Sequence, residues 1–67
     1  MAVARVTEIS ATSSTSFEDA MSQGIERATK TLRNVRGAWI KEQSVRIEDD
    51  KIREYQVNLL VTFVLED

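Results

Sequence analysis

Apolar and small residues recur at helical spacing after the first quarter of the chain. They are Phe17, Ala20, Met21, Gly24, Ile25, Ala28 and Leu32. This is the i, i+3, i+4, i+7 stripe of an amphipathic helix. Ser16 stands before the stripe as a favourable N-cap, and Asp19 completes a capping-box pattern with it. Asn34 or Gly37 can end the helix.

Three other segments have the composition and alternation of strands: residues 3–10, 38–47 and 52–65. The Ser/Thr-rich segment 10–16 indicates a loop before the helix, and the acidic segment 48–51 indicates a hairpin turn. The element order is therefore β-α-β-β. The helix returns the chain, so the first two strands run the same way and the third runs opposite to both. An antiparallel sheet then requires the third strand in the middle.

This order predicts an α+β fold, a three-stranded antiparallel sheet packed on one amphipathic helix, in a single domain over residues 1–67. Alternation in the third strand predicts one face toward the helix, made of Tyr55, Val57, Leu59, Val61, Phe63 and Leu65. The opposite face carries Ile52, Glu54, Gln56, Asn58, Leu60, Thr62 and Val64.

A regular hairpin with Asp49 and Asp50 as its central residues fixes the register of the second strand. It places Ile47 opposite Ile52, Gln43 opposite Gln56 and Trp39 opposite Leu60, and opposed residues share a face. The side away from the helix should then receive Trp39, Lys41, Gln43, Val45 and Ile47, while Ala38 and Ile40 point to the core.

The predicted helix can cover only one face of the sheet. The uncovered face would hold Trp39, Val45, Ile47, Ile52, Leu60 and Val64. At roughly 25 cal/mol per Å² of apolar area, leaving these side chains in water forfeits several kcal/mol, and soluble monomers rarely expose such a patch. We therefore expect this face to be a homo-oligomer interface. A ligand-binding wall built within that interface is the second interpretation.

Composition excludes several classes of function. The 67 residues contain neither Cys nor His, so disulfides and the usual zinc sites are absent. No positioned base or nucleophile stands out, which argues against an enzyme. The net charge is −2, with 9 basic and 11 acidic residues spread along the chain, and this argues against nucleic acid as a partner.

Localisation and metal binding follow from the same composition. No apolar run approaches the ~18 residues of a membrane span, and the N-terminus lacks the apolar region of a signal peptide, so we expect a cytoplasmic protein without a membrane partner. Glu48, Asp49 and Asp50 offer oxygen ligands of the kind Ca²⁺ prefers. They lack the pattern of an EF-hand loop, and an exposed acidic turn is the simpler interpretation. No metal site is predicted.

The whole layout resembles the dodecins, small flavin-binding proteins that assemble as hollow homododecamers. "TSSTSFEDAMSQGIERATKTLRNV" is similar to the family's Ser/Thr-rich loop and helix, and "YQV" and "VTFVLE" are similar to its third strand. In that family a tryptophan of the second strand stacks on the flavin ring and a glutamine of the third strand bonds the polar edge of the ring. The glutamine corresponds to Gln56. The tryptophan position is taken by Gly37, and Trp39 stands two residues further along.

The resemblance implies a protein that stores or buffers riboflavin or FMN in a homododecamer, with Trp39, Gln56, Gly37 and Ser44 as the cofactor-binding positions. Ser44 and Val64 stand where flavin-binding bacterial members often have Arg. Some dodecin-like proteins lack the stacking tryptophan, and a calcium-binding subgroup is among them. The alternative is therefore an oligomeric shell that binds no flavin and has a structural or calcium-binding role.

Overall fold

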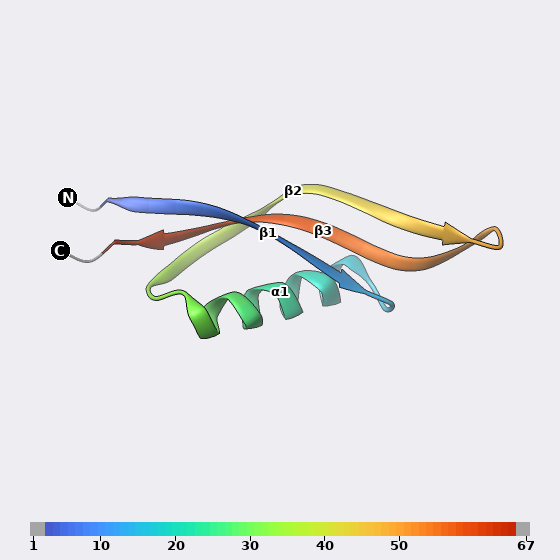
Figure 1. Ribbon diagram of the computed structural model, residues 1–67, viewed down its shortest axis with the longest axis horizontal. Coiled ribbons are helices and arrows are strands. Elements are labelled where there is room, and N and C mark those ends of the chain that lie inside the picture. The colour runs from blue at the N-terminus through green and yellow to red at the C-terminus, as the bar shows by residue number, and fades with distance from the viewer. Residues whose placement is uncertain (1–2, 66–67) are drawn as a thin grey trace.

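The structure is a computed structural model, and it describes residues 3–65. Its elements in chain order are β1 (Ala4–Ser13), α1 (Phe17–Thr31), β2 (Val35–Glu48) and β3 (Lys51–Val64). The strands form one antiparallel sheet in the order β1-β3-β2, and α1 lies across one face of it (Figure 1). The predicted α+β order and the central place of the third strand are both confirmed.

Side chains of the Ser/Thr-rich segment fix the start of α1. Ser16 is the N-cap, and its Oγ accepts from the backbone N–H of Asp19 at 2.9 Å. The Asp19 carboxylate accepts from Ser13 Oγ and from Gln23 Nε2, both at 2.6 Å. The segment therefore ties the end of β1 to the first turn of α1. Asp19 takes part in this tie instead of returning to Ser16 as a capping box would.

Asn34 marks the end of the helical region. It has a φ of 60°, the left-handed conformation that follows many helices, and the Leu32 N–H closes the last turn by donating to the Ala28 carbonyl at 2.9 Å. Gly37, the other predicted end, lies inside β2. β1 and β2 are longer than predicted because both continue pairing with β3. Residues 11–13, expected in a loop, pair with residues 55–57.

The core lies between α1 and the central strand. Its fully buried members are Ala20, Val57, Leu59 and Val61. The partly buried residues packed against them are Ile9, Ala11, Phe17, Met21, Ile25, Leu32, Val35 and Ala38. The rings of Phe17 and Tyr55 meet edge to face, with centroids 5.1 Å apart. The predicted helix-facing side of the third strand is confirmed from Tyr55 to Val61, whereas Phe63 is only half-buried and Leu65 is 45% exposed.

The hairpin joining β2 and β3 has the predicted turn but not a regular ladder. Asp49 and Asp50 have φ values of 52° and 62°, as a two-residue turn with both central residues in the left-handed region requires. Ile47 pairs with Ile52 and Trp39 pairs with Leu60, as predicted. Between these pairs, Arg53 is an extra residue in β3 and Lys41 is an extra residue in β2. Each is a β-bulge, and the second cancels the register shift made by the first.

The two bulges correct part of the predicted face assignment. Gln43 pairs with Val57, not with Gln56, and Ser44 takes the place opposite Gln56. Since paired residues share a face, Gln43 and its alternate neighbours Val45 and Ile47 lie on the helix side of the sheet. Ile52 follows its partner Ile47. These positions were expected on the opposite side because a regular ladder was assumed.

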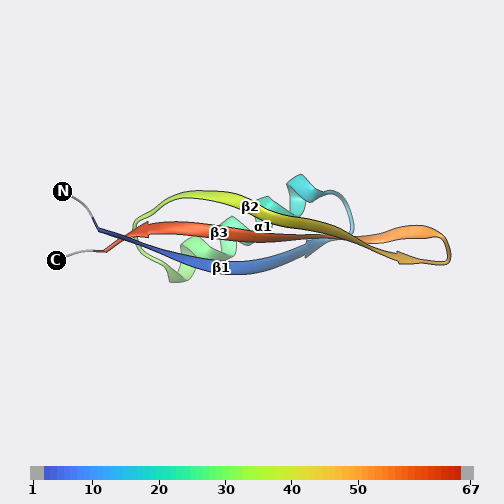
Figure 2. The same cartoon turned by 90° about the horizontal axis from the view of Figure 1, so that it is seen from above.

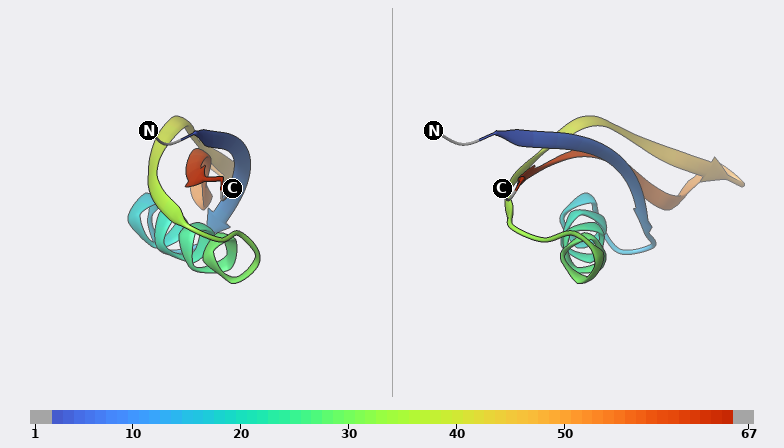
Figure 3. Two further views of the ribbon diagram at one scale, coloured as in Figure 1. Left: turned by 90° about the vertical axis from the view of Figure 1, so that its left-hand side faces the viewer. Right: turned by 60° about the vertical axis from the view of Figure 1, so that its left-hand side comes forward.

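β2 and β3 continue beyond the end of β1 as a two-stranded arm, made of residues 46–53. The arm projects past the start of α1 (Figure 2), and the three-stranded part of the sheet curves over the helix (Figure 3). Neither β1 nor α1 covers the arm, so Ile47 and Ile52 are 64% and 51% exposed. The apolar surface that the sequence assigned to one face is therefore divided between the arm and the face opposite α1.

Gly24 allows α1 to approach the sheet closely. A Cβ built on it would lie 3.0 Å from the Ala11 Cβ and 3.1 Å from a methyl carbon of Leu59. These distances are shorter than ordinary van der Waals contacts, and Leu59 is fully buried and has little room to move. The distance between the helix and β1 is therefore set at this point.

We expect Gly24→Val to lower the free energy of unfolding by about 1–3 kcal/mol, since the added carbons overpack a filled contact. Ser22→Val, at an exposed position of the same helix, is the matched control and introduces the same β-branched side chain. Denaturant titrations of both variants measure the difference. Equal stabilities for the two would show that the close contact at Gly24 does not limit the packing.

Candidate functional site

The face of the sheet opposite α1, called the open face below, carries all four predicted site residues. Strand pairing divides it into two halves. The apolar half contains Val6, Gly37, Trp39, Leu60, Thr62 and Val64. The polar half contains Ser10, Thr12, Glu42, Ser44, Gln56 and Asn58.

Trp39 dominates the apolar half. It lies directly opposite Leu60 on β3 and is 48% exposed, so the indole ring has no cover within its own chain on its outer side. Gly37 lies two residues away on the same face, opposite Thr62. A Cβ built on Gly37 meets nothing within 4 Å, so the surface beside Trp39 is open. This half can take a flat apolar group against the indole.

A chain of hydrogen bonds holds the polar half together. Gln56 Nε2 donates to Ser10 Oγ at 3.1 Å and to Asn58 Oδ1 at 3.3 Å. Ser10 Oγ donates to the same Asn58 oxygen at 3.0 Å. Asn58 Nδ2 donates to Glu42 Oε1 at 3.3 Å. The chain crosses all three strands, because Ser10 and Glu42 are the direct partners of Asn58 on either side.

The structure brings the predicted site residues together in two pairs. Gly37 and Trp39 are neighbours in the apolar half, and Ser44 and Gln56 are cross-strand partners in the polar half. The pairs are four residues apart along β3, counted from Leu60 to Gln56, which is about 13 Å of strand. A single chain therefore does not gather all four residues around one small group.

Four members of the polar half were not predicted as site residues: Ser10, Thr12, Glu42 and Asn58. Asn58 carries a signal in the sequence, since it is an amide placed between two apolar residues of the central strand. Glu42 carries none, because a regular hairpin places Lys41, not Glu42, opposite Asn58. A salt bridge between Lys41 Nζ and Glu8 Oε1, 3.2 Å long and half-exposed, lies where the two halves meet.

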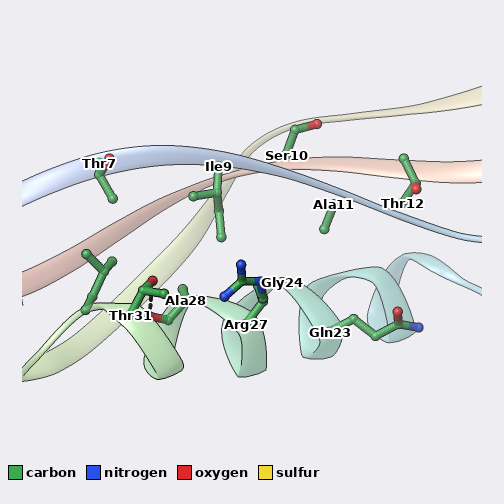
Figure 4. A pocket seen from close by; sticks show the side chains of 11 residues that line it. Thr7, Ile9, Ser10, Ala11, Thr12, Gln23, Gly24, Arg27, Ala28 and Thr31 are labelled. Atoms are coloured by element: carbon green, nitrogen blue, oxygen red, sulfur yellow. Dashed lines mark hydrogen bonds between the residues drawn. The ribbon is translucent and has the colours of Figure 1, made fainter.

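A cavity of about 520 Å³ lies away from the open face, between β1 and α1 (Figure 4). Ile9 and Ala11 point from β1 toward the helix there, and Arg27 of α1 stands at its side. None of the four predicted site residues lines this cavity. It therefore adds nothing to the predicted site.

The acidic turn is paired within the hairpin. Arg53 Nη2 lies 3.7 Å from Asp49 Oδ2, and Arg46 Nε lies 3.6 Å from Glu48 Oε2. Within residues 3–65, no group of three or more acidic, His or Cys side chains is arranged to hold a metal ion. The single helix in this part of the chain is also too short and too polar to span a bilayer.

Comparison with known proteins gives consistent relatives. The sequence model of the family described as Dodecin matches residues 3–66. A dodecin variant from Thermus thermophilus is 36% identical, with a TM-score of 0.93 and 100% of both chains covered. The dodecin from Streptomyces davaonensis is 33% identical, with a TM-score of 0.93, 98% of this chain covered and 97% of its own.

A third solved structure is the calcium dodecin from Mycobacterium tuberculosis, described as calcium chelating with a novel calcium-binding site. It is 32% identical, with a TM-score of 0.82, 96% of this chain covered and 91% of its own. Among curated proteins, none matches the chain. The similar solved structures thus include both a calcium dodecin and other dodecins.

Proposed function

The chain belongs to the dodecin family, and on this premise we propose that it is a cytoplasmic protein that stores or buffers riboflavin or FMN within a homododecamer. The function is binding and not catalysis. The observation that carries the proposal is the open face itself. It presents the half-exposed indole of Trp39 and the hydrogen-bonded amide of Gln56 on a surface that α1 leaves uncovered.

Assembly follows from the apolar surface that the fold leaves in contact with water. Val6 and Trp39 on the open face and Ile47 and Ile52 on the arm are each between 47% and 64% exposed. Complete burial of a fully exposed side chain of this size is worth about 1.5–3 kcal/mol, and roughly half of that remains to be gained by each of these half-exposed residues. Copies of the same chain are the partners expected for a member of this family, and twelve copies would form the particle.

Flavin fits the two halves of the open face in different ways. A stacked aromatic ring gains about 0.5–1.5 kcal/mol beyond its burial, and Trp39 offers such a face. The uracil-like edge of flavin is polar and suits the amide of Gln56. Because these two residues are about 13 Å apart along one chain, a ring held by both would take one from each of two chains.

A flavin-free shell, structural or calcium-binding, is the second candidate. Two observations favour it: Gly37 occupies the position of the family's stacking tryptophan, and one similar structure is a calcium dodecin. Trp39 can replace the missing stacking tryptophan only if its ring reaches the flavin from a position two residues further along the strand, about 6.6 Å away. Quenching of riboflavin fluorescence separates the two candidates, and calorimetric titration with Ca²⁺ tests the ion-binding form of the second.

The flavin proposal predicts an order of affinities. Gln56→Ala should weaken binding by about 0.5–1.5 kcal/mol, the net worth of one hydrogen bond. Gly37→Trp should strengthen binding, because it restores the family's stacking ring at a position with open space around it. Trp39→Ala should weaken binding more than Gln56→Ala if the shifted ring stacks. Riboflavin fluorescence titration measures all three against the unmodified protein, and absence of quenching in all four proteins would favour the flavin-free shell.

The assembly proposal predicts that Leu60→Lys dissociates the particle, since it places an ammonium group beside Trp39 at the centre of the open face. Size-exclusion chromatography with light scattering should then find smaller species, down to the 7.6 kDa chain. Thr29→Lys, which adds the same charge at an exposed position of α1, should leave the particle intact. An unmodified protein that elutes at the mass of one chain would contradict the proposal.

A further inference from the structure

The hydrogen-bond chain of the polar half has a direction. An ionised carboxylate only accepts hydrogen bonds, so Glu42 must face the NH₂ group of Asn58. The Asn58 carbonyl oxygen then faces the other way, where it accepts from both Gln56 Nε2 and Ser10 Oγ. The Glu42 carboxylate therefore fixes the orientation of the Asn58 amide, and the Asn58 amide in turn fixes that of the Gln56 amide.

Both hydrogens of the Gln56 amide are used by this arrangement, one on Ser10 Oγ and one on Asn58 Oδ1. A flipped Gln56 would place its carbonyl oxygen against that of Asn58 at 3.3 Å. Flipping Asn58 as well would place its oxygen against the Glu42 carboxylate. Each alternative brings two acceptors together without a proton between them. Gln56 is therefore held with Nε2 toward Ser10 and Asn58, and no donor among residues 3–65 is bonded to its Oε1.

We infer that the Glu42–Asn58–Gln56 relay makes Gln56 an acceptor only, so that the open face selects planar heterocycles that present a ring N–H to it. This deepens the proposed function and rests on it for the identity of the ligand. An unconstrained glutamine would offer a donor as readily as an acceptor. Here Glu42 and Asn58 act as positioning residues, since they orient the amide of Gln56 through hydrogen bonds within the chain.

The shifted register between the Arg53 and Lys41 bulges gives the relay its direction. In a regular ladder Lys41 would stand opposite Asn58, and an ammonium group only donates. Asn58 would then turn its oxygen toward Lys41 and its NH₂ toward Gln56, and Gln56 would present its own NH₂ to a ligand. The one-residue shift between the two bulges replaces a donor by an acceptor at this position, so a local irregularity of the backbone decides which ligand edges are recognised.

The first test measures selectivity with two probes, riboflavin and riboflavin methylated at N3, which lacks the ring N–H. In the unmodified protein the ratio of their dissociation constants should favour riboflavin by roughly 2- to 12-fold, the range of one net hydrogen bond. In Glu42→Gln and in Asn58→Leu the ratio should fall, because Gln56 is released to turn. Glu54→Gln is the matched control: it removes one charge from the open face, where Glu54 pairs with Arg46, and it should keep the ratio.

The second test needs no ligand. Neutron crystallography of the deuterated, unliganded protein locates the deuterium atoms on the Gln56 amide, and both should point to Ser10 and Asn58. A deuterated nitrogen that points out of the chain overturns the inference, as does an equal selectivity ratio in all four proteins. If riboflavin does not bind at all, the proposed function fails while the neutron map still decides the orientation of Gln56.

Discussion

Two extra residues, Lys41 in β2 and Arg53 in β3, decide which side chains of the hairpin share a face. Between the bulges every residue of β2 is moved one step from the register that the turn alone would set. This step brings Ser44 opposite Gln56 and Glu42 opposite Asn58, and it turns Val45 to the helix side. Because the two shifts cancel, Trp39 keeps its place opposite Leu60. The chemistry of the open face therefore depends on a backbone irregularity of a few residues.

The separation of the open face into an apolar and a polar half affects which residues of two copies can meet when the chains assemble. A two-fold axis that lies between two facing sheets, perpendicular to their strands, would bring the same patch of two copies together with the strands in opposite directions. The apolar half of one copy would then lie near the polar half of the other. Under the proposed function, this arrangement would bring Trp39 of one copy near Gln56 of the other, since about 13 Å of strand divides them within one chain. Binding would thus be a property of the assembled particle.

Much of the architecture was predictable from the sequence because the relevant signals are local. The helix stripe ending at Leu32, the Ser16 cap and the paired Asp residues of the turn each specify a conformation through a few neighbouring residues. The central position of β3 then follows from the directions in which the three strands must run. The bulges at Lys41 and Arg53 were not predictable, because no glycine or other turn residue marks either position; a third irregularity of the same ladder, at Arg36, lies beside Gly37. Ser44 and Gln56 were predicted from the family resemblance and are cross-strand partners on the open face, whereas the place of Glu42 opposite Asn58 was missed because a regular ladder was assumed.

The uncovered arm has a consequence for the energetics of the molecule. An isolated two-stranded hairpin is marginally stable at best in water, and residues 46–53 have neither β1 nor α1 against them. Local opening should therefore begin there, and backbone amides of the arm should exchange with solvent before those of the buried centre of β3. If a second chain covers the arm, mass action links the order of this segment to protein concentration. Folding of the hairpin tip and association of the chains then become a single thermodynamic step.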